Sequence, residues 1–271
     1  MSKILRMSVA CAKECVGQAD APHLDAIVVG TGLGCLHETE KFLNNVLTIE
    51  GLLPPTAFIQ STHNTIAGQI SLSLGNHGYN MTHTQNAFSF EYALQDALML
   101  LNEEATSVLV GGADEAIDFL EDVRSEISVR SSIPLTSGAS FFIVSKEKTP
   151  TSQARIVEVE IGGGVADVKG ALQSFLEIHG RNVSDIDVIA YLSPMHLTGA
   201  DTSAWLGSLG LNSDQCVDIL ALSGMYATAS AFGLHYAVDR IAQKNKISKV
   251  LVLNHLSPNA LGLTLVESIE A

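Results

Sequence analysis

The order of the apolar segments constrains this chain most, because the same succession of strand and helix runs through it twice. In the first half, short apolar runs at 25–30, 79–83, 107–112 and 140–147 surround a helical pattern at 90–103. Runs at 187–192, 216–221, 249–254 and 262–268 surround a helical pattern at 226–243 in the second half. Short apolar runs that alternate with amphipathic stretches predict an α/β fold with mostly parallel strands. We therefore expect two pseudo-repeated α/β halves, 1–150 and 151–271, in one compact unit.

The two halves differ at their starts. Further helical patterns cover 2–17, 37–47, 63–74, 167–180 and 200–208. The second half opens with an extra strand at 155–162, whereas the first half opens with a helix only. The first strand of the N-terminal half is therefore expected to be missing from inside its sheet. Because this exposes backbone groups, we expect a partner chain, for example a second copy, to cover part of the open edge.

Charge and composition exclude several classes of protein. Fifteen Lys and Arg residues oppose 29 Asp and Glu residues, giving a net charge of −14, which disfavours a nucleic-acid partner. No apolar run reaches the ~18 residues that a membrane span needs. The first residues carry Lys13 and Glu14 where a secretory signal would be apolar, so we expect a cytoplasmic protein that does not enter a membrane.

Cofactor motifs are weak. The segment GTGLGC (30–35) follows a strand, but Cys35 occupies the place of the third glycine of a dinucleotide-binding loop, so no nucleotide cofactor is expected. The nine histidines show no metal-ligand spacing, and no metal site is expected. Cys11 and Cys15 share one face of a predicted helix and are interpreted as thiols of a reducing compartment.

One turn has the form of a catalytic site but lacks a nucleophile. In MTHTQNAFSFEYAL (81–94) a strand pattern breaks at Gln85 and a helical pattern starts at Phe90. Enzymes mount nucleophiles on such strand-to-helix turns, where the helix N-terminus supplies N–H donors and partial positive charge. The tip of this turn is Asn86-Ala87-Phe88, with neither a thiol nor a hydroxyl, and Ser89 already enters the helix.

These pieces resemble the β-ketoacyl synthase branch of the thiolase-like superfamily. The resemblance rests on PTAFIQSTHNTIAGQISLSLGNHGYNMT (55–82), on HTQNAFSFEYAL followed by SVLVGGADE, and on LSGMYATASAFGLHYAVDRI (222–241). It implies a thiolase-like fold with a layered α-β-α-β-α arrangement. The most similar branch is the divergent subfamily of bacterial aryl-polyene and pigment gene clusters.

The resemblance also implies that the family's catalytic residues are replaced. The place of the nucleophilic cysteine falls on Ala87, and that of one catalytic histidine on Met225. The other histidine's place falls on Met195, with His196 one residue out of register. A methyl group cannot form a thioester, and a thioether is neither an acid nor a base.

The leading hypothesis is a non-catalytic, chain-length-factor-like partner of an active ketosynthase. In dimers of the family, the strand that corresponds to 79–83 pairs edge to edge with the same strand of the partner. The resemblance therefore implies that residues 60–65 reach toward the partner's acyl pocket. It also implies that this chain contacts an acyl carrier protein through the partner. Candidates for the acyl pocket or the dimer interface are His63, Asn64, Tyr79, Met81, His83, Asn86, Ser89 and Phe90. Two alternatives stay open: a divergent acyltransferase that uses Ser89, His196 or another group, and a non-enzymatic acyl-binding protein.

Overall fold

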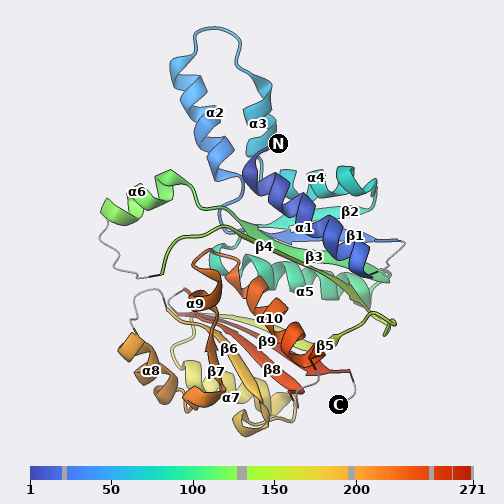
Figure 1. Ribbon diagram of the computed structural model, residues 1–271, viewed down its shortest axis with the longest axis vertical. Helices are drawn as coiled ribbons and strands as arrows, with labels where there is room; N and C mark the ends of the chain where they lie inside the picture. Colours follow the sequence, from blue (N-terminus) through green and yellow to red (C-terminus); the bar gives the residue numbers. More distant parts are fainter. Residues whose placement is uncertain (20–22, 127–132, 195–198, 244–246, 258, 270–271) are drawn as a thin grey trace. The chain divides into compact units, whose positions relative to one another are not determined.

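The computed structural model describes residues 1–19, 23–126, 133–194, 199–243, 247–257 and 259–269. It divides into two compact units (Figure 1). Unit 1 comprises 1–121, 137–149 and 226–228, and unit 2 comprises 122–136, 150–225 and 229–271. Each unit contains one mixed sheet, as the sequence predicts for an α/β fold.

The sheet of unit 1 has the spatial order β2-β1-β3-β4, parallel except for the β3–β4 pair. Its strands are β1 Ala26–Gly30, β2 Tyr79–His83, β3 Ser107–Asp114 and β4 Gly138–Ser145. Helices α1 and α4 cover one face and α5 the other (Figure 1). The helices of this part of the chain are α1 Lys3–Ala19, α2 Leu36–Thr48, α3 Pro55–Ser61, α4 Thr65–Leu74, the 3₁₀ helix η1 Asn86–Phe88, α5 Ser89–Asn102 and α6 Asp118–Glu126.

The sheet of unit 2 has the order β7-β6-β8-β9-β5, in which β9 is antiparallel to both of its neighbours. Its strands are β5 Ala154–Gly163, β6 Val188–Leu192, β7 Cys216–Asp218, β8 Lys249–Asn254 and β9 Ala260–Ser268. Its helices are α7 Val168–Ile178, η2 Val183–Asp185, α8 Gly199–Ser208, η3 Ser213–Gln215, α9 Ile219–Ser223 and α10 Ala229–Ala242.

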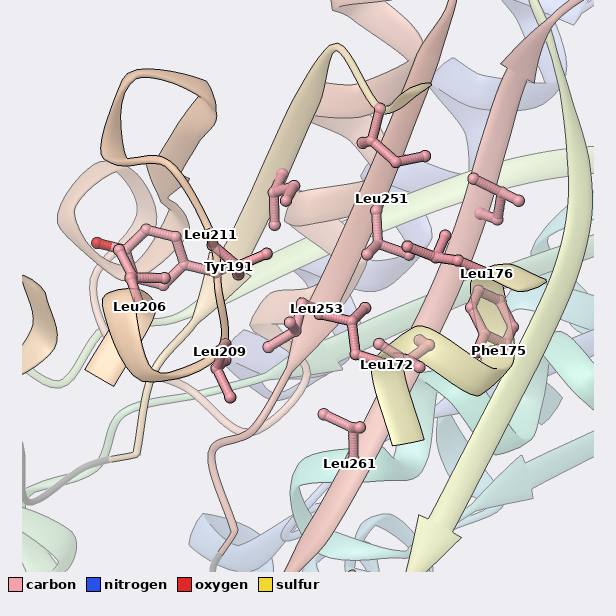
Figure 2. Close-up of a cluster of buried hydrophobic side chains, with 14 residues drawn as sticks. Leu172, Phe175, Leu176, Tyr191, Leu206, Leu209, Leu211, Leu251, Leu253 and Leu261 are labelled. Atoms are coloured by element: carbon pink, nitrogen blue, oxygen red, sulfur yellow. The ribbon is translucent and has the colours of Figure 1, made fainter. Parts of the chain in front are cut away.

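A buried apolar cluster joins one face of this second sheet to α7 (Figure 2). Leu172, Phe175 and Leu176 of α7 pack against Leu251 and Leu253 of the central strand β8. Burial of each such side chain stabilises a fold by about 1.5–3 kcal/mol relative to exposure. The continuous apolar runs in these strands are therefore explained by burial of the sheet.

Strand order confirms the predicted repeat. The order β2-β1-β3-β4 in unit 1 corresponds to β7-β6-β8-β9 in unit 2. A matching hydrogen-bonded aspartate also precedes the second strand of each series. Asp25 Oδ2 accepts from Thr106 N at 2.7 Å, Thr106 Oγ1 at 2.8 Å and Ser107 N at 3.1 Å, which lowers the pKa of this carboxyl to about 2.

Asp187 makes the same contacts in unit 2. Its Oδ2 accepts from Ser248 N at 2.7 Å, Ser248 Oγ at 3.1 Å and Lys249 N at 2.9 Å. In both units the carboxylate therefore fixes the start of one central strand to the start of its parallel neighbour. The repeat is thus preserved in side-chain chemistry, although the two halves share hardly any sequence.

Within the described residues, unit 1 contains no counterpart of β5. The first strand of the N-terminal half is thus absent from the described sheet, as expected. Its place would be at the sheet edge beside β4 and not inside the sheet, because its counterpart β5 is an edge strand. Helix α1 packs against β4, and Cys11 Sγ contacts the carbonyl oxygen of Ala139 at 3.5 Å. A covering helix is one way in which proteins protect a sheet edge.

A second expectation also needs correction, since the strand predicted at 216–221 ends at Asp218. The Asp218 carboxylate accepts from Leu220 N at 2.9 Å and Ala221 N at 3.2 Å, and α9 begins immediately after it. An aspartate N-cap satisfies the free N–H groups of a first turn. A short apolar run alone does not distinguish strand from helix.

Two arginines enclose one buried carboxylate in unit 2. Glu267 of β9 is 1% exposed. Its Oε2 accepts from Arg155 Nη2 at 2.9 Å and its Oε1 from Arg181 Nε at 2.8 Å. Burial opposes ionisation of Glu267, but the hydrogen bonds from Arg181 and Arg155 outweigh it, so its pKa lies below the usual range.

We expect Glu267→Gln to lower the free energy of unfolding by about 2 kcal/mol at pH 7, because charge-assisted hydrogen bonds are lost. A lowered folded-state pKa stabilises the fold above the unfolded pKa, and this stability is lost as pH falls through the folded value. The difference in the free energy of unfolding between wild type and Glu267→Gln, measured by urea unfolding, should therefore decrease from pH 7 toward pH 3. Glu160→Gln, at an exposed position of β5, serves as the control. A gap independent of pH would contradict the ion-pair explanation.

Candidate functional site

The strand-to-helix turn is present as predicted. β2 ends at His83, η1 covers Asn86–Phe88 and α5 begins at Ser89. Asn86 has φ 51, in the left-handed region that asparagine tolerates better than most residues. A Cβ added at Gly30 would lie 2.4 Å from the Ser89 carbonyl oxygen, so the end of β1 passes tightly against the start of α5.

The structure assigns the Ser89 hydroxyl to the turn itself. Ser89 Oγ accepts from Gln85 N and donates to Asn86 O, each at 2.7 Å. Ser89 is completely buried, and Ala87 at the tip of the turn is nearly so. This hydroxyl therefore closes the loop, with its only proton already donated.

A buried carboxylate organises the neighbouring turn. Asp114, at the end of β3, accepts from Thr31 Oγ1 at 3.1 Å and Gly32 N at 2.8 Å through Oδ1. Its Oδ2 accepts from Thr228 N at 2.8 Å and Thr228 Oγ1 at 2.7 Å. Burial raises the pKa of Asp114, and the hydrogen bonds from Thr228, Gly32 and Thr31 oppose that rise. With both oxygens engaged, Asp114 positions the GTGLG turn.

Sequence reasoning missed this residue. The available signal was an acidic residue at the end of the buried strand, two positions after the glycines of SVLVGGADE. Because a buried acid must find donors, Asp114 indicated a polar cluster at this end of the sheet. Its partners Thr31 and Thr228 are 83 and 114 residues away in sequence, so the sequence did not identify them.

Two of the predicted site residues lie against other parts of unit 1. His63 packs on Gly34, where an added Cβ would lie 1.9 Å from His63 Nδ1, and Gly34 has φ +63. Phe90 is buried, with its ring centroid 6.0 Å from that of Phe142. His63 thus adjoins the GTGLG turn, and Phe90 belongs to the apolar interior.

The remaining candidates lie on or beside the edge strand β2. His83 Nε2 lies 2.8 Å from Asp96 Oδ2 of α5. Tyr79 and Met81 are 47% and 41% exposed, unusual values for large apolar side chains of a central α/β sheet. Burial and the neighbouring Asp96 raise the pKa of Tyr79. Three of the predicted residues therefore lie along β2: the exposed Tyr79 and Met81, and His83, which pairs with Asp96 at the end of the strand.

A hydrogen bond connects this strand to the preceding helices. Asn64 Nδ2 donates to Asn80 Oδ1 at 3.0 Å, and Thr65 Oγ1 donates to the Ile59 carbonyl oxygen at 2.9 Å. Asn64 is the N-cap residue of α4, and Ile59 belongs to α3. The segment 60–65 is thereby attached to β2.

Of the two histidine positions that the resemblance implies, one is described. Met225, in unit 2, is buried, and its backbone pairs with residues 134–136: Met225 N donates to Pro134 O at 2.9 Å, and Thr136 N donates to Met225 O at 3.0 Å. Met195 and His196 lie outside the described residues. The described position therefore offers no acid or base.

One buried histidine of unit 2 was not singled out from the sequence. His255 follows β8, and its Nδ1 donates to the Ala260 carbonyl oxygen at 2.7 Å. The Trp205 ring stacks on it with a centroid distance of 5.8 Å and an interplanar angle of 9°. These contacts hold the His255 ring between Trp205 and the first residue of β9.

Among the residues that the structure describes, no group of three or more His, Cys, Asp or Glu side chains could hold a metal ion. Over the same residues, no helix combines the length and the apolar character that crossing a membrane requires.

The profile of the family "Beta-ketoacyl synthase, N-terminal domain" matches residues 1–156, more than half of the chain. Comparison with curated protein sequences gives no match.

Solved structures share the fold at low sequence identity. A β-ketoacyl synthase from Burkholderia phymatum STM815 gives a TM-score of 0.82 at 13% identity, covering 99% of this chain and 83% of that one. The ishigamide ketosynthase/chain length factor gives 0.76 at 18% identity, with coverages of 99% and 81%. The AntDE:AntF assembly, a type II acyl-carrier protein in complex with its ketosynthase, gives 0.76 at 12% identity, with coverages of 99% and 84%. The fold is thus that of thiolase-like ketosynthases.

Proposed function

Because the chain belongs to the β-ketoacyl synthase family, we propose that it is a non-catalytic, chain-length-factor-like partner of an active ketosynthase. In this role it shapes the acyl tunnel of the pair during fatty acid or polyketide-type biosynthesis in the cytoplasm. The active subunit forms the acyl thioester and condenses the chain.

The strand-to-helix turn carries this proposal. It retains the geometry that presents a nucleophile, with a left-handed residue at Asn86 and a helix starting at Ser89. By the family resemblance the nucleophile's place falls on Ala87, and the Ser89 hydroxyl two residues later accepts from Gln85 N and donates to Asn86 O. A strand-to-helix turn without a thiol or a free hydroxyl supports a role in which this chain acts as a scaffold.

The open side of β2 supports a paired subunit. β2 pairs only with β1 in the described sheet, so a row of its backbone N–H and C=O groups faces outward. Pairing with the equivalent strand of a ketosynthase would satisfy these groups and cover Tyr79 and Met81. The neighbouring fold of a ketosynthase/chain length factor supports the same arrangement.

The charge of the chain supports carrier-protein binding by the other subunit of the pair. At a net charge of −14, this subunit would repel an acidic acyl carrier protein. We therefore assign carrier docking to a basic surface of the ketosynthase, with this subunit contacting the carrier through its partner. The AntDE:AntF structure, in which a carrier protein is bound to a ketosynthase, supports that division.

Intact-protein mass spectrometry tests the proposal. The chain is incubated with acyl and malonyl thioesters of carrier protein, alone and together with the ketosynthase encoded nearest to its gene. We expect no acyl mass on this chain, and acylation of the ketosynthase only or better in its presence. Acylation of this chain alone would support the acyltransferase alternative, and the modified residue would identify its nucleophile.

A further inference from the structure

Helices α2 and α3 form a hairpin that extends away from the sheet of unit 1 (Figure 1). Phe42 of α2 packs on Phe58 of α3, with ring centroids 5.2 Å apart. This contact packs the two helices against each other, while several large apolar side chains of the region stay exposed.

One exposed stripe of α2 is apolar. Leu43, Val46 and Leu47 share one face of α2 by their spacing, and Leu47 is 83% exposed. Leu52, between the helices, is 100% exposed. We define the hairpin surface as the exposed apolar side chains of this region: Leu43, Val46, Leu47, Ile49, Leu52, Phe58 and Ile59. Exposed apolar clusters of this kind mark interaction sites.

The hairpin surface is also almost uncharged. From Phe42 to Thr62 the single charged residue is Glu50, in a chain whose net charge is −14. A lipid surface is disfavoured as its occupant, because helices that lie on membranes carry several basic residues and Lys41 is the one Lys or Arg between 36 and 61. A protein surface that is likewise apolar fits better, because burying apolar area against it carries no charge penalty.

The position of the hairpin indicates which protein binds to the hairpin surface. The start of α4 links α3 to the edge strand: Thr65 Oγ1 donates to Ile59 O of α3, and Asn64 Nδ2 donates to Asn80 Oδ1 of β2. A chain that pairs with β2 therefore also meets the end of the hairpin. We propose that the hairpin surface docks into an apolar groove of the ketosynthase subunit and supplies much of the affinity of the pair. This inference rests on the proposed function and assigns its principal contact.

Charged substitutions at the two most exposed positions test this contact. We expect Leu47→Glu and Leu52→Glu each to weaken binding to the ketosynthase encoded nearest to the gene by about tenfold or more, since a buried unpaired carboxylate opposes association. Ile178→Glu is the matched control, because Ile178 of α7 is 76% exposed and far from the hairpin in sequence. Binding is measured by biolayer interferometry, and circular dichroism checks that each variant is folded.

The outcomes separate this inference from the proposed function. If wild type fails to bind the ketosynthase, the proposed function itself is wrong. If wild type binds and both hairpin variants bind equally well, the docking inference alone is overturned. Sedimentation of the chain alone and flotation with phosphatidylcholine–phosphatidylglycerol vesicles complete the test. Self-association or vesicle binding abolished by Leu47→Glu, with ketosynthase binding intact, would overturn the assignment of the occupant.

Discussion

Replacing Asp114 with asparagine is expected to lower the free energy of unfolding by about 3 kcal/mol or more, because several buried donors lose their acceptor. Both carboxylate oxygens accept hydrogen bonds, from Thr31 and Gly32 on one side and from Thr228 on the other. An asparagine side chain keeps one acceptor oxygen and turns an NH₂ group toward the remaining donors. The isosteric change therefore removes interactions on one side and adds a donor–donor repulsion.

Urea unfolding followed by circular dichroism measures this effect. Asp118→Asn is the control, since Asp118 at the start of α6 is exposed. Surface substitutions of this type usually change stability by about 0.5 kcal/mol or less. If Asp114→Asn lowers the free energy of unfolding no more than Asp118→Asn does, the buried carboxylate does not stabilise the GTGLG turn.

Introducing a thiol at Ala87 is expected to create the most reactive cysteine in the protein. Ala87 precedes α5 by two residues, where N–H groups and the helix dipole stabilise a thiolate. Burial raises the pKa of every native thiol, namely those of Cys11, Cys15, Cys35 and Cys216. At pH 7.5 we therefore expect Ala87→Cys to be alkylated by iodoacetamide about tenfold or more faster than any native cysteine.

Peptide mapping by mass spectrometry identifies the labelled site. Ala93→Cys, a buried position in the middle of the same helix, controls for burial without the helix N-terminus. Equal labelling rates for the two introduced thiols would show that the turn no longer activates a nucleophile at this place. It would leave the partner role untouched, because that role requires no reactive atom.

Much of the fold followed from local pattern. The five residues of β2 were predicted to their ends, because Gly78 and the turn after His83 limit a short strand pattern. Helix α3, by contrast, was not predicted. Its seven residues begin at Pro55, and it is held by packing against α2 that no local pattern reveals.

The candidate site could be predicted only where residue identity within one short segment is sufficient. The sequence by itself determined that the turn at 85–89 lacks a thiol, since residue identity is sufficient for that conclusion. The structure decided that Ser89 closes this turn through Gln85 and Asn86, because hydroxyl orientation depends on the folded backbone.

The same division holds for the whole molecule. The sequence determined the alternation of strands and helices and the repeated order of the two halves, because both depend on side-chain periodicity over a few residues. Only the tertiary structure decided that Asp114 accepts hydrogen bonds from Thr31 and Thr228, which are 83 and 114 positions away in the sequence. The same is true of the exposure of the hairpin surface. Such contacts depend on which distant segments meet in the fold, and the periodicity of side chains along the sequence does not reveal which segments these are.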